Sequence, residues 1–188
     1  MTRYFAALTL LLMMGAVLTR VFIMKSKGVD AMQFGRIDKT DYFIPPFALF
    51  YFYLVLAAAF GWPAPSTREL FDSEAVRWVG VALCVAGLTL LAWSLVSFGQ
   101  SFRVGIDTER PDKLITTGIF AFSRNPIYVG FALILLGQFL ISSTWLLLAY
   151  LLAGYWLFHR QVLREEQFLG KYYGDNFENY RQRVRRYL

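Results

Sequence analysis

The sequence predicts an all-α, polytopic integral membrane protein with about five transmembrane helices. Hydrophobic residues make up 57% of the 188 residues and charged residues only 17%, which is too apolar for a water-soluble domain of this size. Several apolar runs approach or reach the roughly 20 residues that a helix needs to cross a bilayer. Aromatic residues reach 18%, and Tyr and Trp concentrate where lipid meets water.

The first half of the chain, residues 1–98, contains three predicted spans. Tyr4–Met24 is apolar for about 20 residues, a length that favours a spanning helix over a cleaved signal peptide. The second span covers residues 42–61 and begins as a helix at Pro45, because proline is tolerated in a first helical turn. The third span, Val76–Phe98, follows a Ser73-Glu74 pair that predicts a capped helix start.

Small residues in the third span predict that another membrane helix packs closely against it. They are Gly80, Ala82, Ala86 and Gly87. Small side chains allow two helix backbones to approach one another within the bilayer.

The second half, residues 99–188, is predicted to hold the functional region. Residues 100–125 form the longest polar segment, and a long loop of this kind typically carries a site. Residues 126–140 and Trp145–Phe158 are short apolar helices separated by a polar turn, which indicates a helical hairpin. The second helix is expected to continue past His159 into the polar region.

The C-terminal segment Asp175–Leu188 is predicted to be a basic amphipathic helix on the membrane surface. Its apolar positions are spaced by three, four and three residues, and four arginines lie mostly on the other face. The apolar residues are Phe177, Tyr180, Val184 and Tyr187.

The distribution of positive charge predicts the orientation. With five membrane segments, 16 of the 19 Lys and Arg residues fall on one side, and only Arg3, Arg68 and Arg77 fall on the other. Because Lys and Arg are retained in the cytoplasm, the N-terminus is expected outside and the C-terminus and functional region inside. The net charge of +6 therefore reflects topology and does not indicate nucleic-acid binding.

The sequence lacks the motifs of dinucleotide-binding, phosphate-binding and metal-binding sites. It contains no Gly-x-Gly-x-x-Gly pattern, no phosphate-binding loop and no Cys/His cluster, and His159 is its single histidine. Neither a metal site nor a Rossmann cofactor site is predicted.

Two polar clusters remain as candidates for a site. Asn125-Pro126 predicts a helix start in which the Asn125 side chain caps free N–H groups, with Arg124 and Tyr128 four residues apart across it. The second cluster lies just past the last apolar run and contains Arg160, Gln161, Arg164, Glu165 and Glu166. Each cluster also has a simpler interpretation, as interfacial anchors or solvated ion pairs, but ionisable groups at a bilayer edge are often functional.

The two clusters together resemble a known enzyme family. Ser-Arg-Asn-Pro-Ile-Tyr-Val-Gly at 123–130 is followed, after the hairpin, by Glu165-Glu166-x-x-Leu169 and by Tyr172-Tyr173-Gly174-Asp175-x-Phe177-x-x-Tyr180. This arrangement is similar to the isoprenylcysteine carboxyl methyltransferases and the related membrane phospholipid methyltransferases. The resemblance covers about residues 98–188.

The resemblance implies an integral membrane enzyme that binds S-adenosylmethionine on the cytosolic side, releases S-adenosylhomocysteine and methylates a lipophilic prenylated acceptor. It implies Glu165 as an acceptor-site residue, with Arg160 or Arg164 as the accompanying positive charge, because the position one turn before Glu165 is Gln161. The family histidine is Asn125 here. The implied cofactor-binding residues are Lys113, Leu114, Ile115, Phe120, Asn125, Pro126, Ile127 and Tyr128.

The leading hypothesis is methylation of the carboxylate of a prenylcysteine-like acceptor. Three alternatives stay open at this point. They are N-methylation of a lipid amine, an NADPH-dependent reductase of the sterol type, and a membrane scaffold without enzymatic activity.

Overall fold

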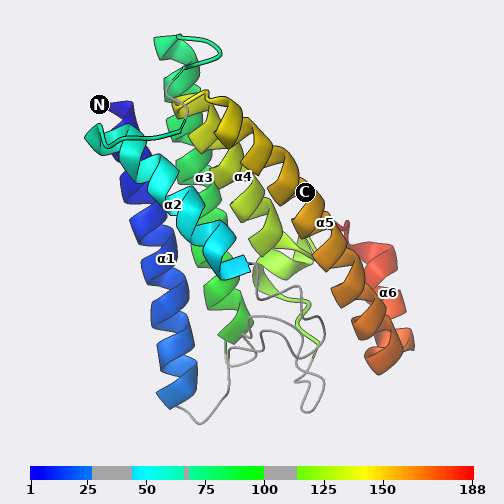
Figure 1. Cartoon of the computed structure of the whole chain (residues 1–188). Helices are drawn as coiled ribbons and strands as arrows, with labels where there is room; N and C mark the ends of the chain where they lie inside the picture. Colours follow the sequence, from blue (N-terminus) through cyan, green and yellow to red (C-terminus); the bar gives the residue numbers. More distant parts are fainter. Residues whose placement is uncertain (27–43, 66–67, 100–113) are drawn as a thin grey trace.

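The protein is a bundle of helices in the computed structural model, which describes residues 1–26, 44–65, 68–99 and 114–188. The helices are α1 (Thr2–Ser26), α2 (Ile44–Phe60), α3 (Glu74–Phe98), η3 (Gly118–Ala121, a 3-10 helix), α4 (Pro126–Ile141), α5 (Trp145–Tyr173) and α6 (Asp175–Arg183). Figure 1 shows α1 to α4 side by side, whereas α5 leans away from α4 toward its own C-terminal end, where α6 lies.

The predicted membrane helices are confirmed, with small shifts at their ends. Helices α1, α3 and α5 are long and apolar enough to cross a membrane, and α2 and α4 are shorter apolar helices. The predicted start of α3 is also confirmed, because the Ser73 hydroxyl accepts a hydrogen bond from the Val76 amide at 3.5 Å. This is a multi-pass integral membrane protein.

The predicted C-terminal helix is too long. Helix α6 ends at Arg183, and Val184 is already extended, with φ −121° and ψ 135°. Residues 184–188 are therefore not helical, and they are called here the C-terminal segment.

Helices α3 and α4 approach one another through two facing pairs of glycines. Gly80 faces Gly137, and Gly87 faces Gly130, so closely that a Cβ atom added at Gly137 would lie 2.6 Å from the Gly80 carbonyl oxygen. The prediction of close packing is confirmed for these glycines, whereas Ala82 and Ala86 are exposed on another face of α3. In lipid, burial of apolar side chains does not drive helices together, because the lipid tails are equally apolar. Close backbone packing of this kind stabilises the helix pair through van der Waals contacts instead.

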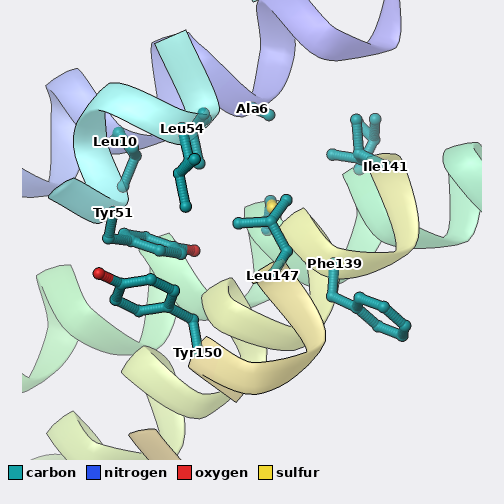
Figure 2. Packing of buried hydrophobic residues seen from close by; sticks show 11 residues of the cluster. Ala6, Leu10, Tyr51, Leu54, Phe139, Ile141, Leu147 and Tyr150 are labelled. Atoms are coloured by element: carbon teal, nitrogen blue, oxygen red, sulfur yellow. The ribbon is translucent and has the colours of Figure 1, made fainter. Parts of the chain in front are cut away.

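A buried cluster joins the other helices to this pair. Figure 2 shows side chains from α1, α2, α4 and α5 meeting there, with the rings of Tyr51 and Tyr150 5.1 Å apart. Gln138 is fully buried, accepts a hydrogen bond from the Tyr51 hydroxyl at 2.8 Å and donates one to the Ala6 carbonyl at 3.3 Å. These bonds connect α4 to α2 and α1 and satisfy a polar group that would be costly to leave unpaired in lipid.

The glycine contacts generate a prediction about stability. Gly137→Ala should lower the free energy of unfolding by about 1–3 kcal/mol, because the added methyl group must displace the Gly80 backbone or Cys84. Gly15→Ala is the matched control, since nothing lies within 4 Å of that position in α1. Thermal unfolding of both variants in detergent checks this, and equal stability of the two would contradict it.

Candidate active site

The polar stretch before α4 is folded back onto α3. Gly118 has φ +64°, a left-handed conformation that favours glycine, and it begins the η3 turn. The Ile119 amide then donates to the Ser97 hydroxyl at 3.4 Å, and the Phe120 ring lies 4.6 Å from that of Phe98. The stretch therefore reaches the start of α4 as an ordered element attached to a long helix.

Asn125 directs its side chain toward α5 and does not cap α4. Its backbone amide donates to the Ser123 hydroxyl at 3.2 Å, but its side chain makes no capping hydrogen bond. The side-chain amide instead donates to Glu166 at 3.1 Å and to the Arg186 carbonyl at 3.2 Å. The predicted capping role is thus wrong, because both amide hydrogens bond to other parts of the chain.

Tyr128 and Glu165 connect α4 to the polar half of α5. The Tyr128 hydroxyl donates to Glu165 Oε1 at 2.5 Å, and the Gln161 side-chain amide donates to the same oxygen at 3.0 Å. Both of these hydrogen bonds end on Oε1 and come from neutral groups. Glu165 is thus held by one donor from α4 and one from its own helix.

Aromatic rings border this pair on the side of the apolar turns of α4 and α5. Phe158 lies 5.9 Å from the ring of Tyr128 and 5.7 Å from that of Phe131, measured between centroids. The hydrogen bond between Tyr128 and Glu165 therefore lies next to an aromatic cluster.

Glu166 is the centre of a buried ionic cluster. Its side chain is only 8% exposed, and it accepts hydrogen bonds from Asn125 and from Arg186, whose Nε lies 2.9 Å from Oε2. Arg124 adds an ion pair at 3.3 Å. The hydrogen bond to Glu166 raises the pKa of the Arg186 guanidinium, which remains charged.

Arg124 keeps two hydrogen-bond donors unused. Its side chain is 8% exposed, and among the described residues neither Nε nor Nη1 has a hydrogen-bond partner. Burial lowers the pKa of its guanidinium, and the neighbouring Glu166 carboxylate opposes that effect. Unpaired N–H donors on a buried guanidinium favour an anionic partner, because hydrogen bonds between ionised groups are shorter and stronger than those between neutral groups.

The C-terminal segment runs alongside the residues that precede α4. Ser123 and Arg185 form an isolated parallel bridge, and the Arg124 amide donates to the Arg185 carbonyl at 2.9 Å. Beyond Arg186, the Tyr187 hydroxyl lies 2.8 Å from His159 Nδ1. Residues more than 60 positions apart in the sequence thus build one side of the site.

Helix α6 is amphipathic, but its apolar residues contact protein. Phe177 and Tyr180 are 3% and 4% exposed, and the Tyr180 hydroxyl donates to the Phe120 carbonyl at 2.7 Å. The interpretation of these residues as a lipid-facing surface is therefore wrong, because η3 and α5 bury them.

The structure brings together only part of the predicted site. Asn125, Tyr128 and Glu165 converge, and Pro126 is buried at the first position of α4. Ile127 packs instead against the cluster around Leu91 and Leu95 on the α3 side.

The remaining predicted residues lie around this centre. Leu114 and Ile115 are half-buried, and Phe120 is a buried residue of η3. The Arg160 guanidinium lies 5.6 Å from the ring centroid of Trp156, Arg164 is half-buried, and both arginines make further contacts. Lys113 lies outside the described residues. No group of three His, Cys, Asp or Glu side chains within residues 1–26, 44–65, 68–99 and 114–188 could hold a metal ion.

Sequence reasoning missed three residues that hold the site together: Glu166 as a buried hub, Arg186 and Tyr187. The C-terminal arginines look alike in the sequence, and only their packing separates Arg186, which pairs with the buried Glu166, from the exposed side chains of Arg181, Arg183 and Arg185. The one available signal was the adjacent Glu165-Glu166 pair, whose members must point in directions about 100° apart on a helix.

The Tyr180 contact predicts a measurable effect of pH. Burial raises the pKa of Tyr180 from 10.0 to about 12. A pKa that folding raises contributes stability below the unfolded value, and that stability is lost as pH rises from about 10 to about 12.

Near neutral pH, Tyr180→Phe should lower the free energy of unfolding by about 1–3 kcal/mol, because the buried Phe120 carbonyl loses its hydrogen-bond donor. The variant should therefore unfold at a lower temperature than wild type. It should also lose less stability than wild type between pH 10 and 12. Tyr172→Phe, at an exposed tyrosine of α5, is the control. Thermal scans against pH test this, and parallel curves for wild type and Tyr180→Phe would refute it.

Curated relatives share the region that forms the site. Protein-S-isoprenylcysteine O-methyltransferase from Schizosaccharomyces pombe is 35% identical over 105 residues, covering 54% of this chain and 44% of that protein. The enzyme of the same name from Xenopus laevis is 27% identical over 164 residues, covering 83% of this chain and 56% of that protein. The chain spans about half the length of the curated relatives it matches.

A solved structure shares the fold. The structure of a eukaryotic intramembrane Ras methyltransferase, an isoprenylcysteine carboxyl methyltransferase, is similar to this one with a TM-score of 0.59 at 20% sequence identity. The similarity covers 88% of this chain and 58% of that chain. It shows a common arrangement of helices.

The family model described as phospholipid methyltransferase matches residues 75–176. That range runs from the start of α3 to the start of α6, and it includes Asn125, Tyr128, Glu165 and Glu166. Since the match covers more than half of the chain, this protein belongs to the phospholipid methyltransferase family, with relatives that are named isoprenylcysteine O-methyltransferases.

Proposed function

We propose that this protein is a membrane methyltransferase that transfers a methyl group from S-adenosylmethionine to the carboxylate of a prenylcysteine-like lipophilic acceptor. The observation that carries this proposal is the junction of α4 and α5, where Tyr128 and Asn125 contact the adjacent carboxylates Glu165 and Glu166. The names of the relatives support the reaction, and the apolar border at Phe158 and Phe131 supports an acceptor that arrives from the bilayer.

The described residues fit a cofactor that has an apolar body and an amino-acid end. Leu114, Ile115, Phe120 and Tyr128 would supply apolar and aromatic contacts, and Asn125 and Pro126 lie beside them at the start of α4. The family resemblance adds Ile127, which packs on the α3 side, and Lys113, which lies outside the described residues. An unpaired N–H of Arg124 could donate to the carboxylate of the amino-acid end. When bound, the cofactor would supply a methyl group whose carbon forms a bond to the acceptor carboxylate oxygen as its bond to the sulfonium sulfur breaks, leaving S-adenosylhomocysteine.

The residues of α5 would orient the acceptor. Glu165 presents Oε2 beside the aromatic border, because Tyr128 and Gln161 both bond to Oε1. Arg164 and Arg160 are the proposed positive charges for the acceptor carboxylate, and Arg164 is the nearer of the two to Glu165 along the helix. A carboxylate is already ionised at neutral pH, so orientation contributes more than proton removal.

The distribution of charge supports the proposed orientation in the membrane. The N-terminus would lie outside, and the C-terminus and the site would lie in the cytoplasm, because 16 of the 19 Lys and Arg residues are then cytoplasmic. That placement gives the site access to a soluble cytosolic cofactor.

One other acceptor has a specific observation in its favour. The matching family model is described as phospholipid methyltransferase, which favours a lipid amine. The donors to Glu165 are the neutral groups of Tyr128 and Gln161, and a carboxylate with neutral partners could also bind an ammonium group.

Cofactor binding tests the proposed donor. The detergent-purified protein should bind S-adenosylmethionine and S-adenosylhomocysteine saturably. Tyr128→Ala should weaken the affinity for both compounds by tenfold or more, because the aromatic contact is lost; tenfold corresponds to roughly 1.4 kcal/mol of binding free energy. Glu165→Gln should leave affinity within about threefold but lower turnover by roughly 100-fold, because it disturbs acceptor orientation.

Calorimetry and a methyl-transfer assay measure the two effects, with Tyr172→Ala as an exposed tyrosine control on α5. If the folded protein binds neither compound but binds a nicotinamide cofactor, the proposal fails in favour of a reductase.

The pH dependence of turnover distinguishes the two acceptors. A carboxylate acceptor is fully ionised above about pH 6, so the rate should be flat from pH 6 to 9. An amine acceptor must lose a proton, so its rate should rise tenfold per pH unit below the amine pKa. Assays with a prenylcysteine and with a phosphatidylethanolamine, each in mixed micelles, measure this. Methylation of the phosphatidylethanolamine alone, at a rate that rises with pH, would overturn the carboxylate assignment.

A further inference from the structure

The C-terminal segment contacts α5 at two points on one face of that helix. Arg186 pairs with Glu166 at 2.9 Å, and the Tyr187 hydroxyl lies 2.8 Å from His159 Nδ1. His159 and Glu166 are seven residues apart, so they lie on one face, about 10 Å apart along the axis. Figure 1 marks the C-terminus beside α5.

The same segment is attached to the residues that begin α4. The Arg186 carbonyl accepts hydrogen bonds from Asn125 at 3.2 Å and from the Ser123 hydroxyl at 3.4 Å, and the Arg185 carbonyl accepts one from the Arg124 amide. The C-terminal segment thus bridges α4 and the polar half of α5, in the region where α5 leans away from α4 in Figure 1.

Glu165 depends on the orientation of α5 about its own axis. Glu165 and Glu166 are consecutive, so their side chains point about 100° apart. When Glu166 is held by Arg186, Asn125 and Arg124, the neighbouring Glu165 is directed at Tyr128. A rotation of α5 that released Glu166 would also break the 2.5 Å contact of Glu165.

We propose that Arg186 and Tyr187 are positioning residues of the methyl-transfer site, which fix the rotation and tilt of α5 and so place Glu165 against Tyr128. This inference rests on the proposed function for its kinetic consequences. Neither residue acts on the acceptor directly, and Arg186 acts through Glu166 while Tyr187 acts through His159. Two contacts about 10 Å apart along α5 constrain both its rotation and its tilt, which a single contact would not do.

Kinetic measurements on matched variants test the proposal. Arg186→Gln should lower kcat by roughly 100-fold, because small misplacements of reacting groups have effects of this size. Its affinity for S-adenosylhomocysteine should stay within threefold. Arg183→Gln removes the same charge from an exposed residue of α6 and should leave kcat unchanged.

Two further variants distinguish positioning from simple stabilisation. Tyr187→Phe loses only the hydroxyl that contacts His159 and should lower kcat severalfold, whereas Tyr172→Phe should not. Arg186→Lys retains the charge and should recover part of the lost rate. A merely structural role would lower the unfolding temperature of Arg186→Gln while kcat per folded molecule stayed at the wild-type value, and that result would overturn the proposal.

A distance measurement tests the inference independently of activity. Spin labels at Phe122 and Tyr172, both exposed, would be introduced in a Cys84→Ser background, since Cys84 is the single native cysteine. Arg186→Gln should give a longer and broader distance distribution than wild type, and Arg183→Gln should not. An unchanged distribution in Arg186→Gln would overturn the positioning role. Absence of methyl transfer by the wild-type protein would instead reject the proposed function.

Discussion

The arrangement of the site depends on the buried carboxylate of Glu166. A buried charge is tolerated only when it is paired and hydrogen-bonded, and Glu166 draws its partners from two parts of the chain: Arg124 and Asn125 just before α4, and Arg186 in the C-terminal segment. Because Glu166 itself lies on α5, satisfying one carboxylate joins the start of α4, α5 and the C-terminal segment. The adjacent Glu165 is thereby left facing Tyr128.

This cluster needs a rigid support, which the glycine contacts between α3 and α4 supply. Gly80 and Gly87 bring the α3 backbone against Gly137 and Gly130, so that α4 has little freedom to slide or rotate. The η3 turn extends the same support, since its Ile119 amide bonds to Ser97 near the end of α3. The start of α4, with Asn125 and Tyr128, is therefore held by the most closely packed part of the bundle.

Glu165 and Glu166 have different roles, because the cluster around Glu166 and the packing of α3 against α4 fix the orientation of α5 relative to α4. Both oxygens of Glu166 bond to the protein, whereas the hydrogen bonds from Tyr128 and Gln161 to Glu165 both end on Oε1. Arg124 pairs with Glu166 through Nη2, and its Nε and Nη1 have no hydrogen-bond partner among the residues that the structure describes. Glu166 thus connects parts of the chain, and Glu165 connects α5 to Tyr128.

The sequence by itself determined the membrane class, the five apolar helices and most of their ends, because length, hydropathy and capping residues such as Ser73 act locally. It also indicated the two clusters that meet in the site, since Asn125-Pro126 and Glu165-Glu166 are recognisable as short motifs. Only the tertiary structure decided that Asn125 bonds to Glu166 and leaves α4 uncapped, and that Phe177 and Tyr180 face protein. It alone distinguished Arg186 from the neighbouring arginines, because which of several like charges pairs with a buried carboxylate depends on a partner 20 residues away in the sequence.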